Sequence, residues 1–249
     1  MGYILEIKNL SVEANENHLK IIHNLSIKFP EESVSVIMGP NGSGKSSLCQ
    51  TIIGNPEYSI TDDLGDILFF NESIKSLKVN ERALKGIFVS FQNPVEVAGV
   101  SIASFLRQSY FNKFKDKKFN DFKEELLKSL ELLKLDNDFI TKSLNENLSG
   151  GEKKKSEILQ LLLLKPKLAI LDEIDSGLDI DALRIVSNAI NTVKNQGTTI
   201  ILVTHYKRLT EYIDDIQNVF VIMDGELKKT GDKKLIEELE KNGYKAINS

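Results

Sequence analysis

Eight consecutive residues decide the fold of this chain: Gly39-Pro40-Asn41-Gly42-Ser43-Gly44-Lys45-Ser46. They fit the pattern G-x-x-x-x-G-K-[ST], with an apolar strand expected before them at 33–38 and a helix expected after them at 45–53. The glycines allow tight turns that aim backbone N–H groups at phosphate, and the start of the helix adds partial positive charge. Lys45 should reach the β- and γ-phosphates of a nucleotide, and the Ser46 hydroxyl should bind Mg²⁺. The stretch therefore predicts a nucleoside-triphosphate site.

A second chemical feature is an apolar run that ends in two carboxylates. Residues 168–171 (LAIL) form an expected buried strand, and Asp172 and Glu173 follow it. Open α/β sheets bind ligands at the carboxyl ends of their strands, so Asp172 is placed to hold Mg²⁺ directly or through water. Glu173 can reach an attacking water and act as general base. By itself, such a pair is more often an ordinary turn or helix start; its combination with the phosphate loop favours catalysis.

Apolar periodicity places strands and helices in alternation around these motifs. Strands are expected at 4–7, 21–29, 33–38, 67–70, 87–91, 168–171 and 198–203, with a hairpin of 219–223 and 226–230 that turns at Asp224-Gly225. Helices are expected at 45–53, 149–164, 179–194 and 233–241. Continuously apolar strands that alternate with helices are typical of an α/β fold whose mainly parallel sheet is covered on both faces.

The middle of the chain has a different pattern. From about Ser101 to Leu135 apolar residues recur at helical spacing, which predicts a helical subdomain. The same segment contains a lysine-rich stretch from Lys113 to Lys123, for which the ordinary interpretation is a solvated helix end or loop.

Composition excludes several classes of protein. The net charge of −4 over 249 residues gives no basic footprint of the kind that nucleic-acid binders carry. A single cysteine, Cys49, forms no internal disulfide and cannot hold an iron–sulfur cluster, and it favours a reducing compartment. The first residues lack the pattern of a signal peptide, and no apolar run is long enough to span a bilayer. We therefore expect a cytoplasmic protein, or one of the plastid stroma if a targeting peptide has been removed.

The segment Leu148-Ser149-Gly150-Gly151-Glu152 combines a helix start with open backbone. Ser149 and Glu152 are spaced as a capping box, and the two glycines leave N–H groups available to a γ-phosphate. This segment resembles the signature motif of the ABC family of ATPases. The resemblance implies that the motif acts in trans, on the ATP of a partner subunit, in a transient ATP-bound homodimer.

The family resemblance also implies an architecture. It predicts an α/β fold with a RecA-like, mainly parallel sheet core, an N-terminal antiparallel β subdomain and an inserted helical subdomain. Residues 1–249 would form one ABC ATPase domain, with 1–92 and 149–249 as catalytic core and β subdomain and about 93–148 as helical subdomain.

Three further motifs occur in the order that the family has. Gln92 resembles the Q-loop glutamine near Mg²⁺ and the attacking water, Ser176-Gly177-Leu178-Asp179 resembles the D-loop, and His205 resembles the switch histidine at the γ-phosphate. The implied catalytic residues are Glu173, His205 and Gln92, and the implied metal ligands are Ser46, Gln92 and Asp172. The implied nucleotide-binding residues are those of the loop from Gly39 to Ser46, then Ser47, Ser149, Gly150, Gly151, Glu152 and Asp179. The segment 13–20 lacks the aromatic residue on which the family often stacks adenine, and His18 is the candidate substitute.

Four stretches narrow the family resemblance. Residues 91–101, 149–159, 168–182 and 204–209 resemble the SufC subfamily, the ABC-type ATPases of iron–sulfur cluster assembly. That resemblance implies ATP and Mg²⁺ as cofactors and the scaffold proteins SufB and SufD as partners. The alternatives are the nucleotide-binding subunit of an ABC importer and a nucleotide-gated scaffold module that hardly hydrolyses ATP. Glu173 and His205 argue against the last of these.

Two further hypotheses follow from the same resemblance. Residues 93–106, just after the Q-loop, are the candidate docking face for partners, against the simpler interpretation of a subdomain linker. Lys154, on the helix after the signature motif, is a candidate to pair with Glu173 and slow hydrolysis in the isolated subunit, against the interpretation that it is exposed on a helix face.

Overall fold

The computed structural model describes residues 2–62, 64–92, 94–205 and 207–247. A six-stranded sheet lies at its centre, in the order β13-β12-β3-β11-β10-β7. All neighbouring strands are parallel except β12 and β13, which form an antiparallel hairpin at one edge. The strands are β3 (Val34–Met38), β7 (Ile87–Ser90), β10 (Leu168–Asp172), β11 (Thr199–Val203), β12 (Ile216–Met223) and β13 (Glu226–Gly231).

Successive residues of the central strands enter two different hydrophobic cores. In β10, Ile170 packs into the core on one face and Leu171 into the core on the other. Leu202 and Val203 of β11 divide in the same way. Because side chains alternate across a strand, a strand that is apolar at every position must be covered on both faces. This is the arrangement that the sequence pattern predicts.

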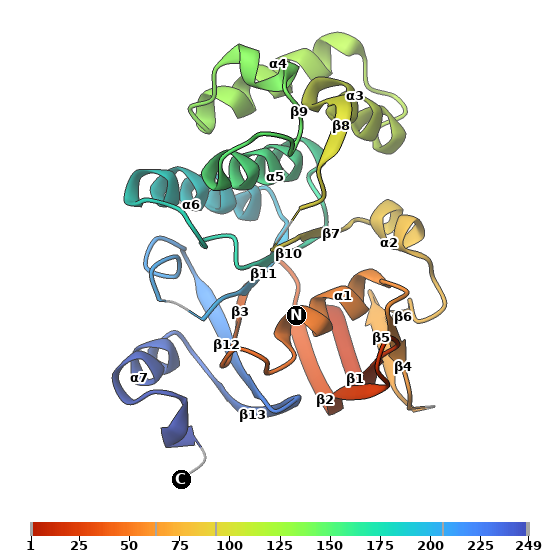
Figure 1. Ribbon diagram of the computed structural model, residues 1–249, viewed down its shortest axis with the longest axis vertical. Coiled ribbons are helices and arrows are strands. Elements are labelled where there is room, and N and C mark those ends of the chain that lie inside the picture. The colour runs from red at the N-terminus through yellow and green to blue at the C-terminus, as the bar shows by residue number, and fades with distance from the viewer. Residues whose placement is uncertain (1, 63, 93, 206, 248–249) are drawn as a thin grey trace.

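One face of the central sheet packs on α1 (Lys45–Ile53) and, beyond it, on an antiparallel sheet. Figure 1 shows this sheet in the lower part of the molecule, with α1 between the two sheets. Its strands are β1 (Tyr3–Ala14), β2 (Leu19–Pro30), β4 (Tyr58–Ile60), β5 (Asp66–Phe69) and β6 (Glu72–Ser73). The short α2 (Val79–Lys85) follows this sheet and leads into β7.

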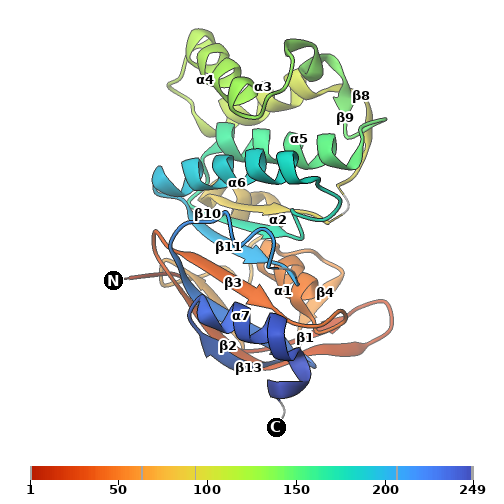
Figure 2. The ribbon, with the colours of Figure 1, turned by 90° about the vertical axis from the view of Figure 1, so that its left-hand side faces the viewer.

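The other face carries α5 (Gly150–Leu164), α6 (Ile180–Asn195) and α7 (Lys234–Asn242), with the final turn η2 (Tyr244–Ile247). Figure 2 shows the resulting layers, with α5 and α6 between the central sheet and a helical arm. α6 has a buried apolar stripe that includes Leu183, Val186, Ile190 and Val193. These residues recur at three- and four-residue spacing, which explains why this segment forms a helix against the sheet.

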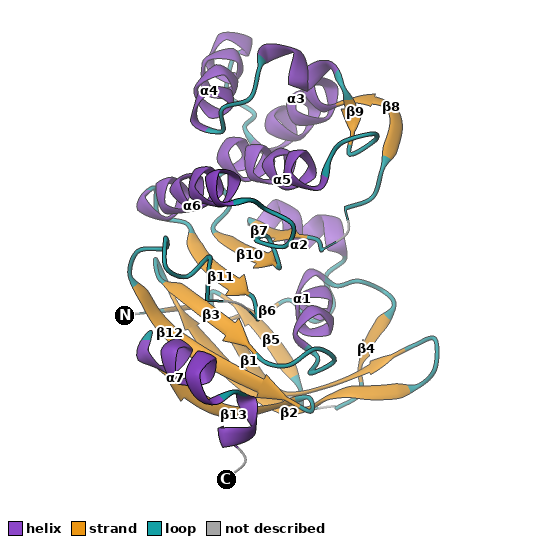
Figure 3. Cartoon of the chain, turned by 60° about the vertical axis from the view of Figure 1, so that its left-hand side comes forward, coloured by secondary structure: helices purple, strands orange, loops and turns teal. Residues whose placement is uncertain are grey.

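The helical arm consists of β8 (Val97–Ser101), α3 (Ile102–Lys113), α4 (Phe119–Leu132), η1 (Asn137–Thr141) and β9 (Ser143–Leu144). β8 and β9 pair with each other as a separate two-stranded sheet that connects the arm to the core, as Figure 3 shows. The arm buries aromatic side chains against α5, among them Tyr110 of α3 and Phe122 of α4. The predicted helical segment is thus two helices, because the chain turns between Phe114 and Lys118.

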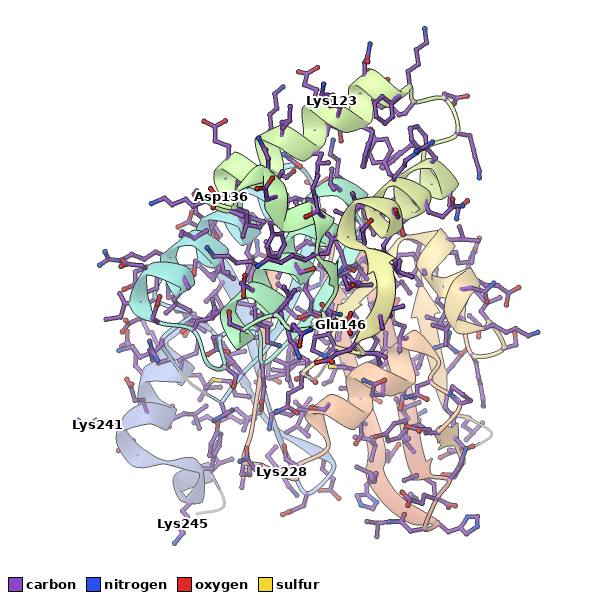
Figure 4. The ribbon with its side chains drawn as sticks, turned by 45° about the horizontal axis from the view of Figure 1, so that its top comes forward. Lys123, Asp136, Glu146, Lys228, Lys241 and Lys245 are labelled. Atoms are coloured by element: carbon purple, nitrogen blue, oxygen red, sulfur yellow. The ribbon has the colours of Figure 1, made fainter. Side chains whose placement is uncertain are left out.

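The lysine-rich stretch is only partly solvated. Lys123 points outward from α4 in Figure 4, as expected. Lys113, in contrast, is half-buried, and its Nζ donates to the carbonyl oxygens of Leu164 and Lys165 at the end of α5. Burial lowers its pKa to about 8. The expectation of a solvated run is therefore wrong for Lys113, which satisfies carbonyl groups that a helix end leaves open.

The α/β class and the parallel core are confirmed. The sequence pattern did not predict five short elements: β4, β6, α2, β8 and β9. It also placed the first two strands too narrowly, since β1 and β2 each extend over 12 residues. In the described part of the chain, no helix is both long and apolar enough to cross a membrane.

Candidate nucleotide-binding and hydrolysis site

Four loops meet at one edge of the central sheet. The strands β3, β11, β10 and β7 are neighbours and parallel, so their carboxyl ends lie side by side. Gly39 follows β3, Thr204 follows β11, Glu173 follows β10 and Phe91 follows β7. Parallel topology therefore brings together residues as far apart in the chain as Gly39 and Thr204, as in other open α/β sheets.

These loops enclose a cavity of about 620 Å³. Residues 41–47 of the phosphate loop form its floor, and the candidate hydrolytic residues Gln92, Glu173 and His205 also line it. The remaining lining residues are Leu19, Lys20, Ile21 and His23 of β2, and Asp224 and Gly225 of the β12–β13 turn. The volume is in the range typical of small-molecule sites.

Glycine is required where the phosphate loop leaves β3. A Cβ on Gly39 would lie 2.0 Å from the carbonyl oxygen of Ile222 in the neighbouring strand. Gly44, at the N-cap of α1, has a φ of 98°, a conformation that side chains disfavour. The loop can therefore pass close to β12 and then turn its N–H groups toward the cavity only with these two glycines.

Lys45 lies at the start of α1 and is buried. Its Nζ donates to the carbonyl oxygens of Gly39 at 2.8 Å and Pro40 at 2.9 Å. Burial lowers the pKa of Lys45, and the charges of Glu173 and Asp172 act in the opposite direction. The ammonium is thus held against the loop itself, at the place where a phosphate would offer stronger, charged acceptors.

Glu173 is held by two of the other candidate residues. Gln92 donates a hydrogen bond from Nε2 to Glu173 Oε2, and His205 Nδ1 lies 3.2 Å from Glu173 Oε1. The backbone of Glu173 is left-handed, with a φ of 47°, and its N–H donates to the carbonyl oxygen of Val203. Strained backbone of this kind clusters at functional sites, and here it turns the carboxylate from the end of β10 toward the cavity.

Asp172 and Ser46 form a candidate cation site. Asp172 is buried, and its Oδ1 has no hydrogen-bond partner in the structure. Burial raises its pKa, and the Ser46 hydroxyl acts in the opposite direction. A buried carboxylate oxygen without a partner fits a divalent cation, and Mg²⁺ takes few protein ligands beside phosphate and water. The described ranges contain no cluster of three or more His, Cys, Asp or Glu that could hold a metal ion.

The segment around Gly150 starts α5 as predicted. Ser149 Oγ accepts from the N–H of Glu152 at 3.3 Å, and Glu152 Oε2 accepts from the N–H of Ser149 at 2.9 Å. Ser149 and Gly150 are exposed, and neither they nor Gly151 line the cavity at the phosphate loop. Asp179 caps α6 by accepting from the N–H of Ala182 at 2.7 Å, and it does not line the cavity either.

The chain matches the family model described as ABC transporter over residues 22–176. It is 44% identical over 250 residues to a probable ATP-dependent transporter, ycf16, of Cyanophora paradoxa, covering 98% of this chain and 95% of that protein. The chain belongs to the ABC transporter family. It is therefore an ATP-binding cassette with ATP hydrolase activity.

Two more relatives and two solved structures are similar to this chain. The probable ATP-dependent transporter slr0075 of a Synechocystis strain is 46% identical, with 97% of this chain and 94% of that protein covered. ABC transporter I family member 6, chloroplastic, of Arabidopsis thaliana is 40% identical, with 98% of this chain and 73% of that protein covered. A nucleotide-free cassette from an ABC transporter superposes with a TM-score of 0.76 at 25% identity, covering 100% and 99%. A dimeric cassette bound to ADP and Pi has the same fold at 19% identity, with a TM-score of 0.78. The match covers 92% of this chain and 98% of that chain.

The structure of the cassette differs from the sequence-based expectation at the outer end of the cavity. His18 does not line the cavity; its side chain is 82% exposed and lies 2.7 Å from Glu13. Leu19, Ile21 and His23, which sequence reasoning did not select, lie there instead, beside Gly225. The turn pair Asp224-Gly225 was the sequence signal that could have predicted this part of the cavity, because a hairpin next to β3 must reach the phosphate loop. In the structure, the N–H of Gly225 donates to the carbonyl oxygen of Ser43.

Lys154 does not lie on an exposed helix face, which was one of the two interpretations of its sequence position. It is buried, and its Nζ donates to the carbonyl oxygens of Phe91 at 3.1 Å and Gln92 at 3.3 Å. Within the described residues, the ion-pair partner of Lys154 is Glu157, at 3.7 Å, while Glu173 contacts Gln92 and His205. The pairing of Lys154 with Glu173 is thus not the arrangement that this structure shows.

Proposed function

We propose that Glu173 is the general base of ATP hydrolysis and that Gln92 and His205 position it and the attacking water. The observation that carries this assignment is the contact of both side chains with the two carboxylate oxygens of Glu173 at the mouth of the phosphate-loop cavity. When Lys45 exchanges the loop carbonyls for phosphate, its charge stabilises the negative charge that develops during phosphoryl transfer.

Mg²⁺ is the proposed metal cofactor, held by Ser46 and Asp172 with Gln92 nearby. Bound there, the ion would bridge phosphate oxygens and neutralise their charge. The unpartnered Oδ1 of Asp172 next to the Ser46 hydroxyl supports this assignment.

The proposed active form is a transient homodimer. Ser149, Gly150 and Gly151 present open backbone at the start of α5 but lie outside the cavity of their own chain. A helix N-terminus with exposed N–H groups attracts a phosphate, so a second chain is needed to bring ATP to it. A cassette with the same fold is dimeric with ADP and Pi bound.

The proposed role of hydrolysis is to drive conformational change in a scaffold of SufB and SufD type during iron–sulfur cluster assembly. Support comes from the stretches that resemble the SufC subfamily, which lie at the Q-loop, on α5, after β10 and after β11. The closed, ATP-bound dimer would shift the scaffold toward the conformation that fits it. We propose the cytoplasm or the plastid stroma as the compartment; the name of the chloroplastic relative supports the second of these.

The segment 93–106 is the proposed docking face, and its first residue, Asn93, lies outside the described residues. Val95, Val97 and Val100 are exposed there, at 76%, 37% and 37%. Three exposed valines on one short segment are unusual for a surface that stays in water. An ABC importer permease is the second candidate for the partner, favoured by the names of the relatives, which are probable ATP-dependent transporters.

Co-purification from the native host tests this proposal. The chain, tagged at its C-terminus, should bring down soluble β-helical proteins related to SufB and SufD, identified by mass spectrometry. Val95→Asp with Val97→Asp should abolish recovery, because the charges oppose burial of this face. The control Leu127→Asp, at an exposed apolar position of α4, should leave recovery unchanged. Recovery of a membrane permease would overturn the iron–sulfur role while leaving the ATPase assignment intact.

A further inference from the structure

Two oppositely charged side chains are buried on α5, outside the proposed catalytic set. Lys154 and Glu157 lie one turn apart, 3.7 Å from each other, with side chains only 6% and 5% exposed. Burial raises the pKa of Glu157. Because an ion pair in the interior costs nearly as much desolvation as it gains in attraction, this pair is a poor device for stability alone.

The pair holds the main chain of the Q-loop from two sides. Glu157 Oε1 accepts from the N–H of Phe91 at 2.8 Å. Lys154 Nζ donates to the carbonyl oxygens of Phe91 and Gln92 at 3.1 and 3.3 Å. Both side chains thus make charge-assisted hydrogen bonds to the peptide groups that flank the Cα of Phe91, the first residue beyond β7.

The side chain of Gln92 completes a chain of contacts. Its main chain is held by α5, and its Nε2 donates to Glu173 Oε2. α5 also carries Ser149, Gly150 and Gly151 at its start. One rigid helix therefore links the segment that a partner's nucleotide would contact to the glutamine that touches the catalytic carboxylate of its own chain.

We infer that Glu157, together with Lys154, is a positioning residue that sets the place of Gln92 against Glu173 and couples it to the orientation of α5. The inference rests on the roles proposed for Gln92 and Glu173. A shift of α5 would move the Phe91 and Gln92 peptides with it. Such a shift would change the hydrolytic step without a change in the residues that bind the nucleotide.

Steady-state ATP hydrolysis by a set of variants tests this inference. Glu157→Ala should lower kcat about tenfold or more with little change in the KM for ATP, because small displacements of a catalytic group are costly. Glu157→Gln keeps an oxygen that can accept from the Phe91 N–H, so it should retain most of the activity. Glu124→Ala is the matched control, since Glu124 pairs with Lys128 one turn away on the surface of α4.

The double variant distinguishes positioning from support of the fold. In a Gln92→Ala background, Glu157→Ala should cause no further loss, because the group that it positions is already gone. An equal fold-loss in both backgrounds would overturn the inference. If Gln92→Ala alone left kcat unchanged, the role of Gln92 under the proposed function would be refuted. This result differs from the one that refutes the positioning role of Glu157.

A second pair of substitutions guards against simple unfolding. Glu157→Ala leaves the Lys154 charge buried without its partner, which can destabilise the chain. Lys154→Met with Glu157→Leu removes both charges and keeps the volume, so thermal unfolding should stay near that of the wild type. The inference requires that this folded variant also lose kcat; full activity would refute it.

Discussion

At the scale of single residues, the site is held in a resting arrangement by its own side chains. Lys45 donates to carbonyl oxygens of the phosphate loop, and Glu173 is engaged by Gln92 and His205. Each of these contacts occupies a group that ATP, Mg²⁺ or water would use. Binding of nucleotide must therefore exchange internal hydrogen bonds for stronger ones to phosphate.

Glu173→Gln tests the proposed role of Glu173 as general base. The amide keeps the size of the side chain and can still contact Gln92, but it cannot take a proton from water. We expect kcat to fall by about 100-fold or more, since general bases contribute 10²- to 10⁴-fold. ATP affinity, measured by titration calorimetry, should stay close to the wild-type value. Glu131→Gln, on the exposed face of α4, is the control and should leave both quantities unchanged.

Sequence reasoning predicted which residues would reach the cavity better than it predicted their mutual contacts. Local patterns place Gly39 to Ser46, Asp172 and Glu173 at the ends of strands, and parallel topology then brings them together. The contact of Lys154 with Phe91 and Gln92 joins residues more than 60 positions apart, and no local pattern encodes it. The same holds for Leu19 and His23, which reach the cavity only because β2 runs beside the β12–β13 turn.

At the scale of elements, α5 illustrates how a helix start serves two purposes. The capping box of Ser149 and Glu152 satisfies two N–H groups and leaves those of the following glycines open. Lys142 lies 2.6 Å from Glu152. The Lys142 ammonium and the Ser149 N–H together lower the pKa of Glu152 to about 2.

The depressed pKa predicts a specific acid dependence of stability. Because the folded pKa lies below the ordinary value of 4.5, the stabilisation is fully present above that pH and is lost as pH falls toward 2. Glu152→Gln keeps the cap but not the charge, so it should cost about 1 kcal/mol at pH 6 after solvent screening. The difference from wild type should shrink at pH 3 in urea unfolding followed by circular dichroism.

Lys142→Met provides the companion measurement for Glu152. Removal of the ammonium should weaken the loss of stability on acidification, as Glu152→Gln does, because Lys142 is the largest cause of the lowered pKa of Glu152. A difference between wild type and Glu152→Gln that stayed constant from pH 6 to pH 3 would contradict the assignment.

Elements with a regular apolar pattern were predictable. α6 has apolar residues at three- and four-residue spacing, and β11 is apolar at four of its five positions. The break between α3 and α4 contains neither glycine nor proline; α4 begins where Asp121 accepts from the N–H of Lys118. β8 and β9 form only because the two ends of the arm meet, which is a tertiary event.

At the scale of the whole molecule, the cavity and the start of α5 are separate surfaces of one chain. Residues 41–47, Gln92 and Glu173 belong to the first, and Ser149 to Gly151 belong to the second. A homodimer related by a twofold axis pairs each surface with its complement on the other chain. Two composite sites would then form together.

Two single variants can each disable one surface without unfolding the chain. Lys45→Ala removes the ammonium that is proposed to bind phosphate. Gly150→Asp places a carboxylate where a partner's phosphate would lie; a Cβ at Gly150 meets no atom within 4 Å, and a negative charge favours a helix N-terminus. Each variant alone should lose most ATP hydrolysis while keeping the unfolding temperature of the wild type.

A mixture of the two variants decides whether the sites form in trans. The mixed dimer joins the intact phosphate loop of the Gly150→Asp chain to the intact α5 of the Lys45→Ala chain. With half of the dimers mixed and one of two sites intact in each, roughly a quarter of wild-type activity should return. Lys45→Ala mixed with Glu173→Gln should remain inactive, since both residues serve the same surface. No recovery in the first mixture would show that α5 does not act on the partner's nucleotide.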